Sequence, residues 1–228
     1  MIATCKCPEV NQLIAELPTR ERDDLLNHCE LIELTSGEVL SARQVSYSHA
    51  WFPLTAFISV KAAVSEHPAM EVGMIGHEGM LGVTLLLAVD QAPHQAMITG
   101  PGKALRISRE ELQELLQGCP ELLLGLQHYC FQLMEQMTQT AICTHFHRVE
   151  ERLARWLLMT HDRSQGDDLY LTHQLLANLL GVRRSAVTLA SGILKKNGLI
   201  GYSRGRIRIL DRQGLEEAAC ECYGTLPP

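Results

Sequence analysis

The chain has 228 residues, 46% of them hydrophobic, and a formal net charge of −6 at neutral pH. This length and composition favour two globular domains and exclude a disordered or fibrous chain. The longest apolar run, residues 80–89, is about half the roughly 20 residues that span a bilayer. No signal peptide is recognisable, so we expect a cytoplasmic protein that does not enter the membrane and whose eight cysteines are reduced.

Charge is divided unevenly along the chain. Residues 1–148 carry 9 Lys or Arg against 17 Asp or Glu, whereas residues 149–228 carry 11 against 9. Residues 168–212 carry eight basic side chains and two acidic ones. This local excess of positive charge indicates a surface that binds a polyanion.

The N-terminal region is predicted to be rich in strands. Residues 10–29 have the apolar spacing of an amphipathic helix, which Pro18 interrupts. After it, short β-rich runs are separated by Gly, Pro, Asp and Ser rather than by helices. The expected strands are residues 31–34, 39–42, 56–62, 70–75 and 95–98. Consecutive short strands of this kind favour an antiparallel roll or sandwich.

Two helices are expected in the middle of the chain. Ser108 and Glu111 have the spacing of a capping box, which predicts a helix to about Gln117. After Pro120 a longer helix is expected, with a repeat of alternating spacings of four and three at Leu126, Cys130, Leu133, Met137, Thr140 and Thr144. The repeat is typical of a coiled-coil seam between two copies of the chain. The alternative is a helix that packs on its own β-domain.

Two short helices are predicted after residue 168. Before them, a helix over residues 149–160 is expected to bury Leu153, Trp156 and Leu157. Thr172 is a favourable N-cap for the first short helix, and Gly181 supplies a turn after it. The second begins near Arg183, ends at a stop signal, Asn197-Gly198, and is expected to turn inward Val187, Ala190, Ile193 and Leu194. Two short helices across a glycine turn are typical of a helix-turn-helix.

The second of these helices carries the candidate base contacts. In a helix-turn-helix its N-terminal side chains enter the major groove, where arginine matches the edge of guanine. The candidates are Arg183, Arg184, Ser185 and Thr188. Further on, residues 199–200 and 207–210 flank a basic turn with Arg204 and Arg206. This pattern predicts a hairpin that lies along phosphates, the wing of a winged helix.

The stretch from Leu171 to Ser185, LTHQLLANLLGVRRS, and the later Gly198-Leu199-Ile200 resemble the DNA-binding domain of the CRP/FNR superfamily of bacterial regulators. The resemblance implies an α+β fold with a cyclic-nucleotide-binding-type antiparallel β-roll, a long dimerisation helix and a C-terminal winged helix-turn-helix. We assign these parts to residues 1–118, 119–147 and 148–228. The resemblance also implies a homodimer that regulates transcription by binding double-stranded DNA at a palindromic operator, with RNA polymerase as a partner.

Transferred by position, the base-reading arginine of the family falls on Arg184, whereas Ser185 and Leu189 replace a Glu and a second arginine. We therefore expect a half-site that differs from that of the cyclic-AMP receptor protein. His173 and Gln174 fall where that protein contacts phosphate, and with Thr172 they complete the candidate DNA contacts.

The effector pocket departs from the pattern of the family. Where cyclic-nucleotide-binding members carry a Glu for ribose and an Arg for phosphate, this chain has Met80 and His94. Burying a phosphate without a fixed cation is costly, and a neutral histidine is a poor substitute. The pocket candidates are Gly79, Met80, Leu81, Gly82, His94, Gln95, Met137 and Thr138. We predict that the effector is not cyclic AMP, and we assign no cofactor.

The cysteines and histidines offer an alternative sensor. Cys5, Cys7, Cys29 and Cys119 resemble the iron–sulfur ligands of some members in broad outline, but their spacing differs. Cys220 and Cys222 are placed in a C-terminal tail, as a thiol switch or as ordinary cysteines. His145 and His147 are interpreted as ordinary residues, because helical positions two apart point to different faces, and no metal site is predicted.

Two other function classes stay open. One is a cyclic-nucleotide-type ligand-binding module without DNA activity, and the other is a redox or metal sensor without a cyclic-AMP response. The basic winged segment favours the regulator over the binding module without DNA activity. The sequence offers no nucleophile with a base and no phosphate-cradling loop, so we expect no enzyme activity.

Overall fold

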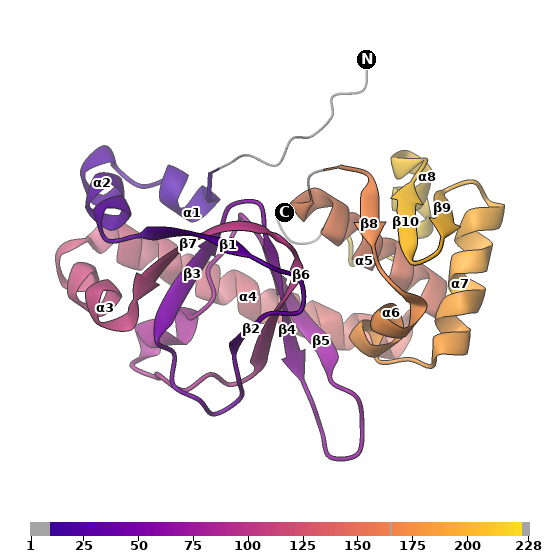
Figure 1. The fold of residues 1–228 in the computed structure, drawn as a ribbon, viewed down its shortest axis with the longest axis horizontal. Helices are drawn as coiled ribbons and strands as arrows, with labels where there is room; N and C mark the ends of the chain where they lie inside the picture. The colour runs from indigo at the N-terminus through magenta and orange to yellow at the C-terminus, as the bar shows by residue number, and fades with distance from the viewer. Residues whose placement is uncertain (1–9, 165, 225–228) are drawn as a thin grey trace. The chain divides into compact units, whose positions relative to one another are not determined.

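The computed structural model describes residues 10–164 and 166–224 and has an α+β fold (Figure 1). The described residues fall into two compact units. The first comprises residues 10–60 and 73–135, and the second comprises residues 61–72, 136–164 and 166–224. No helix in the described ranges has both the length and the apolar character needed to cross a membrane.

The first unit contains the β-roll. Its helices are α1 (Gln12–Ala15), α2 (Thr19–Asn27), the 3-10 helix η1 (Val83–Leu87) and α3 (Arg109–Gly118). Its strands are β1 (Glu30–Leu34), β2 (Val39–Ser41), β3 (His49–Pro53), β6 (Gln95–Gly100) and β7 (Gly102–Ser108). Three elements continue into the second unit: β4 (Phe57–Ala62), β5 (Met70–Ile75) and α4 (Pro120–Phe146).

Two sheets build the roll, one in the order β1-β7-β3 and one in the order β2-β6-β4-β5. The pairs β1–β7, β3–β7 and β2–β6 are antiparallel. Fully buried side chains come from both sheets, among them Phe52, Ile58, Ile75, Ile98 and Ile107. The sheets therefore share one apolar core, and its burial stabilises the unit.

All five predicted strands are confirmed, as β1, β2, β4, β5 and β6. The sequence analysis missed β3 and β7. Strand β3 is buried at four consecutive positions, so it lacks the alternation of a half-buried strand. The capping box is confirmed, because the backbone N–H of Glu111 donates to Ser108 Oγ at 3.2 Å. Pro18 separates α1 from α2 as predicted.

Helix α4 buries one of the six residues of the predicted coiled-coil seam within its own chain. Leu126, the first seam residue, is fully buried within its own chain. The face that α4 buries has successive spacings of four, three, seven and seven, at Leu122, Leu126, Tyr129, Gln136 and Cys143. The other seam residues, from Cys130 to Thr144, are half-buried or exposed, so the seam between two copies of the chain stays a prediction. The exposed large apolar side chains of α4 lie at Leu124, Phe131, Met134, Ile142 and Phe146.

The second unit carries the helix-turn-helix. Its further elements are α5 (Val149–Arg163), β8 (Asp168–Tyr170), α6 (His173–Leu180), α7 (Arg184–Lys196), β9 (Ile200–Ser203), β10 (Arg206–Ile209) and α8 (Arg212–Ala218). The strands form an antiparallel sheet in the order β8-β10-β9. Helix α5 buries Leu153, Trp156 and Leu157 as predicted. Trp156 Nε1 also donates to Glu71 Oε1 at 2.7 Å, which ties α5 to the hairpin between β4 and β5.

Candidate nucleic-acid interface

Helices α6 and α7 are joined as the sequence predicts. Thr172 caps α6, because its hydroxyl accepts the backbone N–H of Leu175 at 3.1 Å. The helix ends at Gly181, whose φ of +64° lies in the left-handed region that favours glycine. Helix α7 starts at Arg184, with Arg183 as its N-cap residue. The turn is thus set by a threonine cap and a glycine stop.

The N-terminal part of α7 presents one polar face to solvent. Arg183, Arg184, Ser185 and Thr188 are all exposed. The opposite face buries Val187, Ala190, Ser191 and Leu194 against the rest of the unit. Ile193 was expected to point inward but is 38% exposed, which corrects that prediction. The N-terminal end of a helix also carries a partial positive charge, so the two arginines add to a field that attracts anions.

The exposed face of α7 includes an apolar side chain that was not a candidate site residue. Leu189 is 69% exposed, one position beyond Thr188. A leucine on a groove-facing helix suits contact with a thymine methyl group. The sequence carried a signal for this position, because Leu189 falls where the resembling family has a second arginine.

His173 is half-buried and contacts other residues of the motif. Its ring stacks on Tyr202 with centroids 4.2 Å apart, and Nδ1 lies 3.0 Å from Thr188 Oγ1. The Thr188 hydroxyl donates to the carbonyl of Arg184 at 3.0 Å, so Nδ1 must be the donor to Thr188. Burial, aided by the charge of Arg184, lowers the pKa of His173, which keeps the ring neutral at pH 7. His173 thus fixes α7 and β9 relative to α6, and the phosphate contact expected of it stays a prediction.

The predicted hairpin is present between β9 and β10. Arg204 and Gly205 form its turn with φ values of +48° and +80°. Positive φ at both central residues is the signature of a type I′ turn, whose twist matches that of the strands. Arg204 is exposed at the tip of this wing. Gln174, the remaining phosphate candidate, is exposed on α6 and donates to Asn178 Oδ1 at 3.0 Å.

Asp168 binds both arginines of strand β10. Its Oδ1 accepts from Arg206 Nε and Arg208 Nε, each at 2.8 Å, and Oδ2 contacts the Nη2 atoms of both. These hydrogen bonds, from Arg208 first and then Arg206, hold the pKa of Asp168 well below its usual range. Arg206 also lies over the ring of Tyr170, at 5.8 Å from the centroid. Arg206 is thus paired with an acid of its own unit, which neutralises part of its charge.

The effector-pocket candidates of the first unit form part of its core. Met80 and Leu81 are buried, and Leu81 exchanges backbone hydrogen bonds of 2.9 and 3.0 Å with Trp51. Gly79 accepts from Asn11 Nδ2 at 2.8 Å, and Gly82, at φ +100°, precedes η1. Met80, which stands where cyclic-nucleotide-binding members carry a Glu, is thus a core side chain.

The remaining pocket candidates are more accessible. Burial and the nearby Arg43 lower the pKa of the half-buried His94, so this side chain is neutral at pH 7. Gln95 opens β6 and is half-buried. Met137 and Thr138 belong to the second unit, in the part of α4 after residue 135. Met137 is half-buried and Thr138 is exposed.

The structure describes six of the eight cysteines. Cys5 and Cys7 lie outside the described residues. Burial raises the pKa of Cys29 to about 12 and also raises that of Cys119. Cys220 and Cys222, expected in a tail, are 5% and 3% exposed. They follow α8, a helix that the sequence analysis did not predict.

Comparison with known proteins bears on both units. Residues 151–218 match the family model of the Crp-like helix-turn-helix domain. A comparison with curated protein sequences found no match. Similar solved structures cover most of the chain, at sequence identities that support likeness of fold alone.

Three of these structures show the range of the likeness, and two of them are described as regulators. A regulator of the Crp/Fnr family from Eubacterium rectale has a TM-score of 0.70 at 16% identity, over 91% of this chain and 97% of its own. FixK2 from Bradyrhizobium japonicum has a TM-score of 0.71 at 14% identity, over 84% and 98%. The c-di-GMP-responsive global regulator CLP of Xanthomonas campestris has a TM-score of 0.66 at 18% identity, over 84% and 99%.

Proposed function

The chain has the fold of the CRP/FNR superfamily of transcription regulators and carries a Crp-like helix-turn-helix domain, and on this premise we propose that it acts as a homodimer on a palindromic operator. The observation that carries the proposal is the exposed N-terminal face of α7, with Arg183 and Arg184 held over a packed helix pair. An arginine at this position of a recognition helix fits the major groove.

Each exposed side chain has a distinct role in this proposal. Arg184 reads a guanine through two hydrogen bonds, and Leu189 contacts a thymine methyl group. Ser185 and Thr188 lie beside them on the same face. Arg204 at the wing tip, and Arg206 after it leaves Asp168, bind phosphates, which position the protein without reading sequence.

A dimer is proposed through α4, with exposed apolar side chains of this helix beside the seam expected from the sequence. Phe131 and Met134 are each 63% exposed and lie three positions apart on one face of the helix. Substituting both with Asp should give monomers in analytical ultracentrifugation, whereas Gln132→Asp, on an exposed polar position nearby, should leave dimers. A wild-type protein that is monomeric at micromolar concentration would refute the dimer.

The effector is proposed to be a compound other than cyclic AMP. Met80 contributes to the core and His94 is neutral, so no charged partner for a cyclic phosphate stands at either position. Calorimetry should detect no tight binding of cyclic AMP, and stoichiometric binding would contradict this. Because one structural neighbour is described as responsive to c-di-GMP, that nucleotide is the second ligand to test.

Footprinting of the bound sites in living cells tests the function as a whole. We expect protection of short inverted repeats upstream of genes, where a regulator meets RNA polymerase. Binding without sequence preference, or no binding, would favour a ligand-binding module without DNA activity. Sites that vanish in an Arg184→Ala strain would link the footprint to α7.

A further inference from the structure

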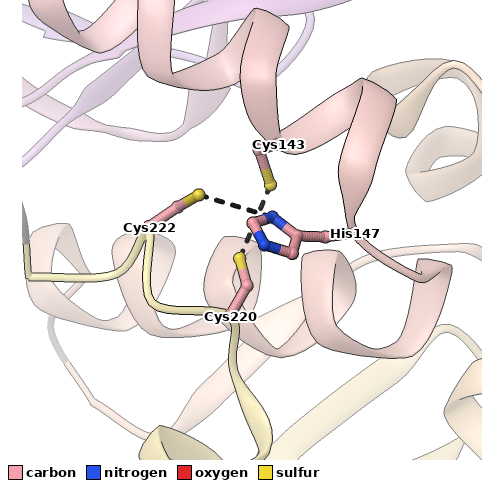
Figure 2. Close-up of side chains that lie close together, drawn as sticks. All are labelled: Cys143, His147, Cys220 and Cys222. Carbon is pink, nitrogen blue, oxygen red and sulfur yellow. Dashed lines mark hydrogen bonds between the residues drawn. The ribbon is translucent and has the colours of Figure 1, made fainter.

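Four side chains of the second unit converge where α4 ends and the chain returns after α8. They are Cys143, His147, Cys220 and Cys222, shown in Figure 2. One ligand atom from each lies within 4.8 Å of all the others. The three cysteines are buried and His147 is half-buried, so the cluster is shielded from water.

Local backbone structure brings each pair to the cluster. The backbone N–H of His147 donates to the carbonyl of Cys143 at 3.1 Å, so the two residues lie one helical turn apart on one face. After α8 the chain turns, with the N–H of Tyr223 donating to the carbonyl of Cys220 at 3.0 Å. This turn directs the sulfurs of Cys220 and Cys222 toward His147 and Cys143 (Figure 2).

The returning segment is held by a polar network. Arg212 Nη2 donates to the hydroxyl of Tyr223 and to Asp162 Oδ1, each at 2.7 Å. The same hydroxyl lies 3.1 Å from Asp162 Oδ2. Tyr223 is thereby tied to α5, directly after the second cysteine. The cysteines thus sit on a fixed turn, which a preorganised site requires.

The separations of the ligand atoms fit a single tetrahedral ion. With Zn–S bonds of about 2.3 Å and Zn–N bonds of about 2.0–2.1 Å, tetrahedral ligands lie roughly 3.8 Å apart for two sulfurs and 3.6 Å for sulfur and nitrogen. Cys143 Sγ lies 3.5 Å from Cys220 Sγ, and Cys222 Sγ lies 3.4 Å from His147 Nδ1. Each observed distance is within a few tenths of an ångström of the tetrahedral value.

The surroundings of the cluster also suit a metal. His147 turns Nδ1 toward the sulfurs, while Nε2 lies 3.2 Å from Glu221 Oε2. A carboxylate on the second ring nitrogen is the usual way in which proteins orient a metal-binding histidine. Gln139 Nε2 donates to Cys222 Sγ at 2.7 Å, a hydrogen bond that stabilises a thiolate.

Positive charge lies beside the sulfurs. Arg155 Nε donates to the backbone carbonyl of Cys222 at 3.4 Å, and both Arg152 and Arg155 are at most 8% exposed. Three thiolates and one neutral imidazole around a divalent cation leave a net charge of −1. Buried guanidinium groups compensate such a charge.

We propose that Cys143, His147, Cys220 and Cys222 bind one Zn²⁺ ion as a structural Cys₃His site. The three thiols lose their protons to solvent on binding, and His147 coordinates through Nδ1. All four positions are filled by protein, so no position is left open for catalysis. The ion joins the end of α4 to the segment after α8 and closes a loop that contains the whole helix-turn-helix.

A disulfide explains less of the geometry. Joining Cys143 to Cys220 would use two of the four side chains and would leave the placement of Cys222 and His147 unexplained. Metal content distinguishes the two, and it does so whether or not the protein binds DNA. The full chain is purified under reducing conditions without chelator, and its metals are measured by mass spectrometry. We expect one zinc per chain in the wild type and in Cys29→Ala, and at least a tenfold loss in Cys143→Ala and Cys222→Ala.

Cobalt binding by the wild-type protein tests the site without any variant, so it remains informative if the cysteine variants fail to fold. Wild-type protein stripped of metal should bind one Co²⁺ with the visible absorption of a tetrahedral thiolate site, and added Zn²⁺ should displace it. The melting temperature should fall on chelation and recover with Zn²⁺. Stripped protein that binds neither ion, one iron in place of zinc, or a Cys143–Cys220 disulfide in the freshly purified protein would each overturn the proposal.

Discussion

Helix α7 and the wing formed by β9 and β10 are both basic in sequence, but their arginines differ in whether an acidic side chain pairs with them. On α7, Arg183 and Arg184 are exposed at a helix N-terminus. On β10, Arg206 and Arg208 share the carboxylate of Asp168. The number of basic residues in a segment therefore overstates the positive charge that is available to bind DNA, because an acidic side chain of the same unit neutralises part of that charge.

Strand register explains the difference. Arg206 and Arg208 are two positions apart on β10 and so point to the same face, and Arg208 stands directly opposite Asp168 on β8. The carboxylate reaches both guanidinium groups from there. Helix α7 has no comparable acid, since the chain from residue 169 to residue 210 contains none. We therefore assign sequence reading to α7 and an adjustable, weaker phosphate contact to the wing.

Replacing Arg184 with Ala should have the largest effect. Loss of a two-bond arginine–guanine contact costs about 1–3 kcal/mol, roughly a 5- to 150-fold loss of affinity for the best site. Binding to unrelated DNA should change little. Competition binding with single-base variants of the site measures both. An Arg184→Ala protein with the wild-type preference at every position would remove Arg184 from base reading.

Replacing Arg206 with Ala serves as the contrast on the wing. Affinity should fall evenly across sequences, because phosphates carry no sequence information. The slope of log affinity against log salt should drop by less than about one ion, since Asp168 already neutralises part of this charge. A loss confined to one base pair would show that the wing reads sequence.

Replacing Asp168 with Asn should release both wing arginines and strengthen binding. We expect a modest gain in affinity for all DNA and a salt dependence steeper by about one to two ions. Glu217→Gln is the matched control, because it removes the same charge from an exposed position on α8 without touching the wing. Equal effects of the two variants would mean that overall charge, not the pairing, controls the wing.

The smallest effect concerns stability against pH. The folded pKa of Asp168 is lowered, so its contribution to stability is complete above the unfolded pKa, about 3.9, and is lost as pH falls toward the folded value. The difference in melting temperature between wild type and Asp168→Asn should thus be constant near neutral pH and shrink below about pH 4. A difference that disappears already at pH 6 would contradict the arginine pairing.

Much of the fold follows from local pattern. The two helices of the motif, its glycine turn, the hairpin and five strands of the roll were all predicted, because capping residues, glycines and apolar spacing act over a few positions. Long-range pairing was not predictable in this way. Asp168 binds Arg206 and Arg208, which lie 38 and 40 positions further along the chain, and no local spacing pattern predicts this pairing.

The cluster of Cys143, His147, Cys220 and Cys222 shows the same limit more strongly. From the sequence, Cys220 and Cys222 are interpreted as part of a C-terminal tail, and His147 is considered together with His145. The useful pair was Cys143 with His147, four apart on one helical face, a spacing that the sequence does contain. Cys220 lies 77 positions after Cys143 in the chain, and only the fold brings the two side chains together.

Selection of binding sites from random duplex DNA by the wild-type protein tests the central claim most directly. Two recognition helices related by a two-fold axis should enrich an inverted repeat whose half-sites are centred about 10 base pairs apart, with a preferred guanine in each half. Enrichment of such a repeat is the predicted result. Recovery of sequences with no shared motif, or of one asymmetric site, would contradict the account.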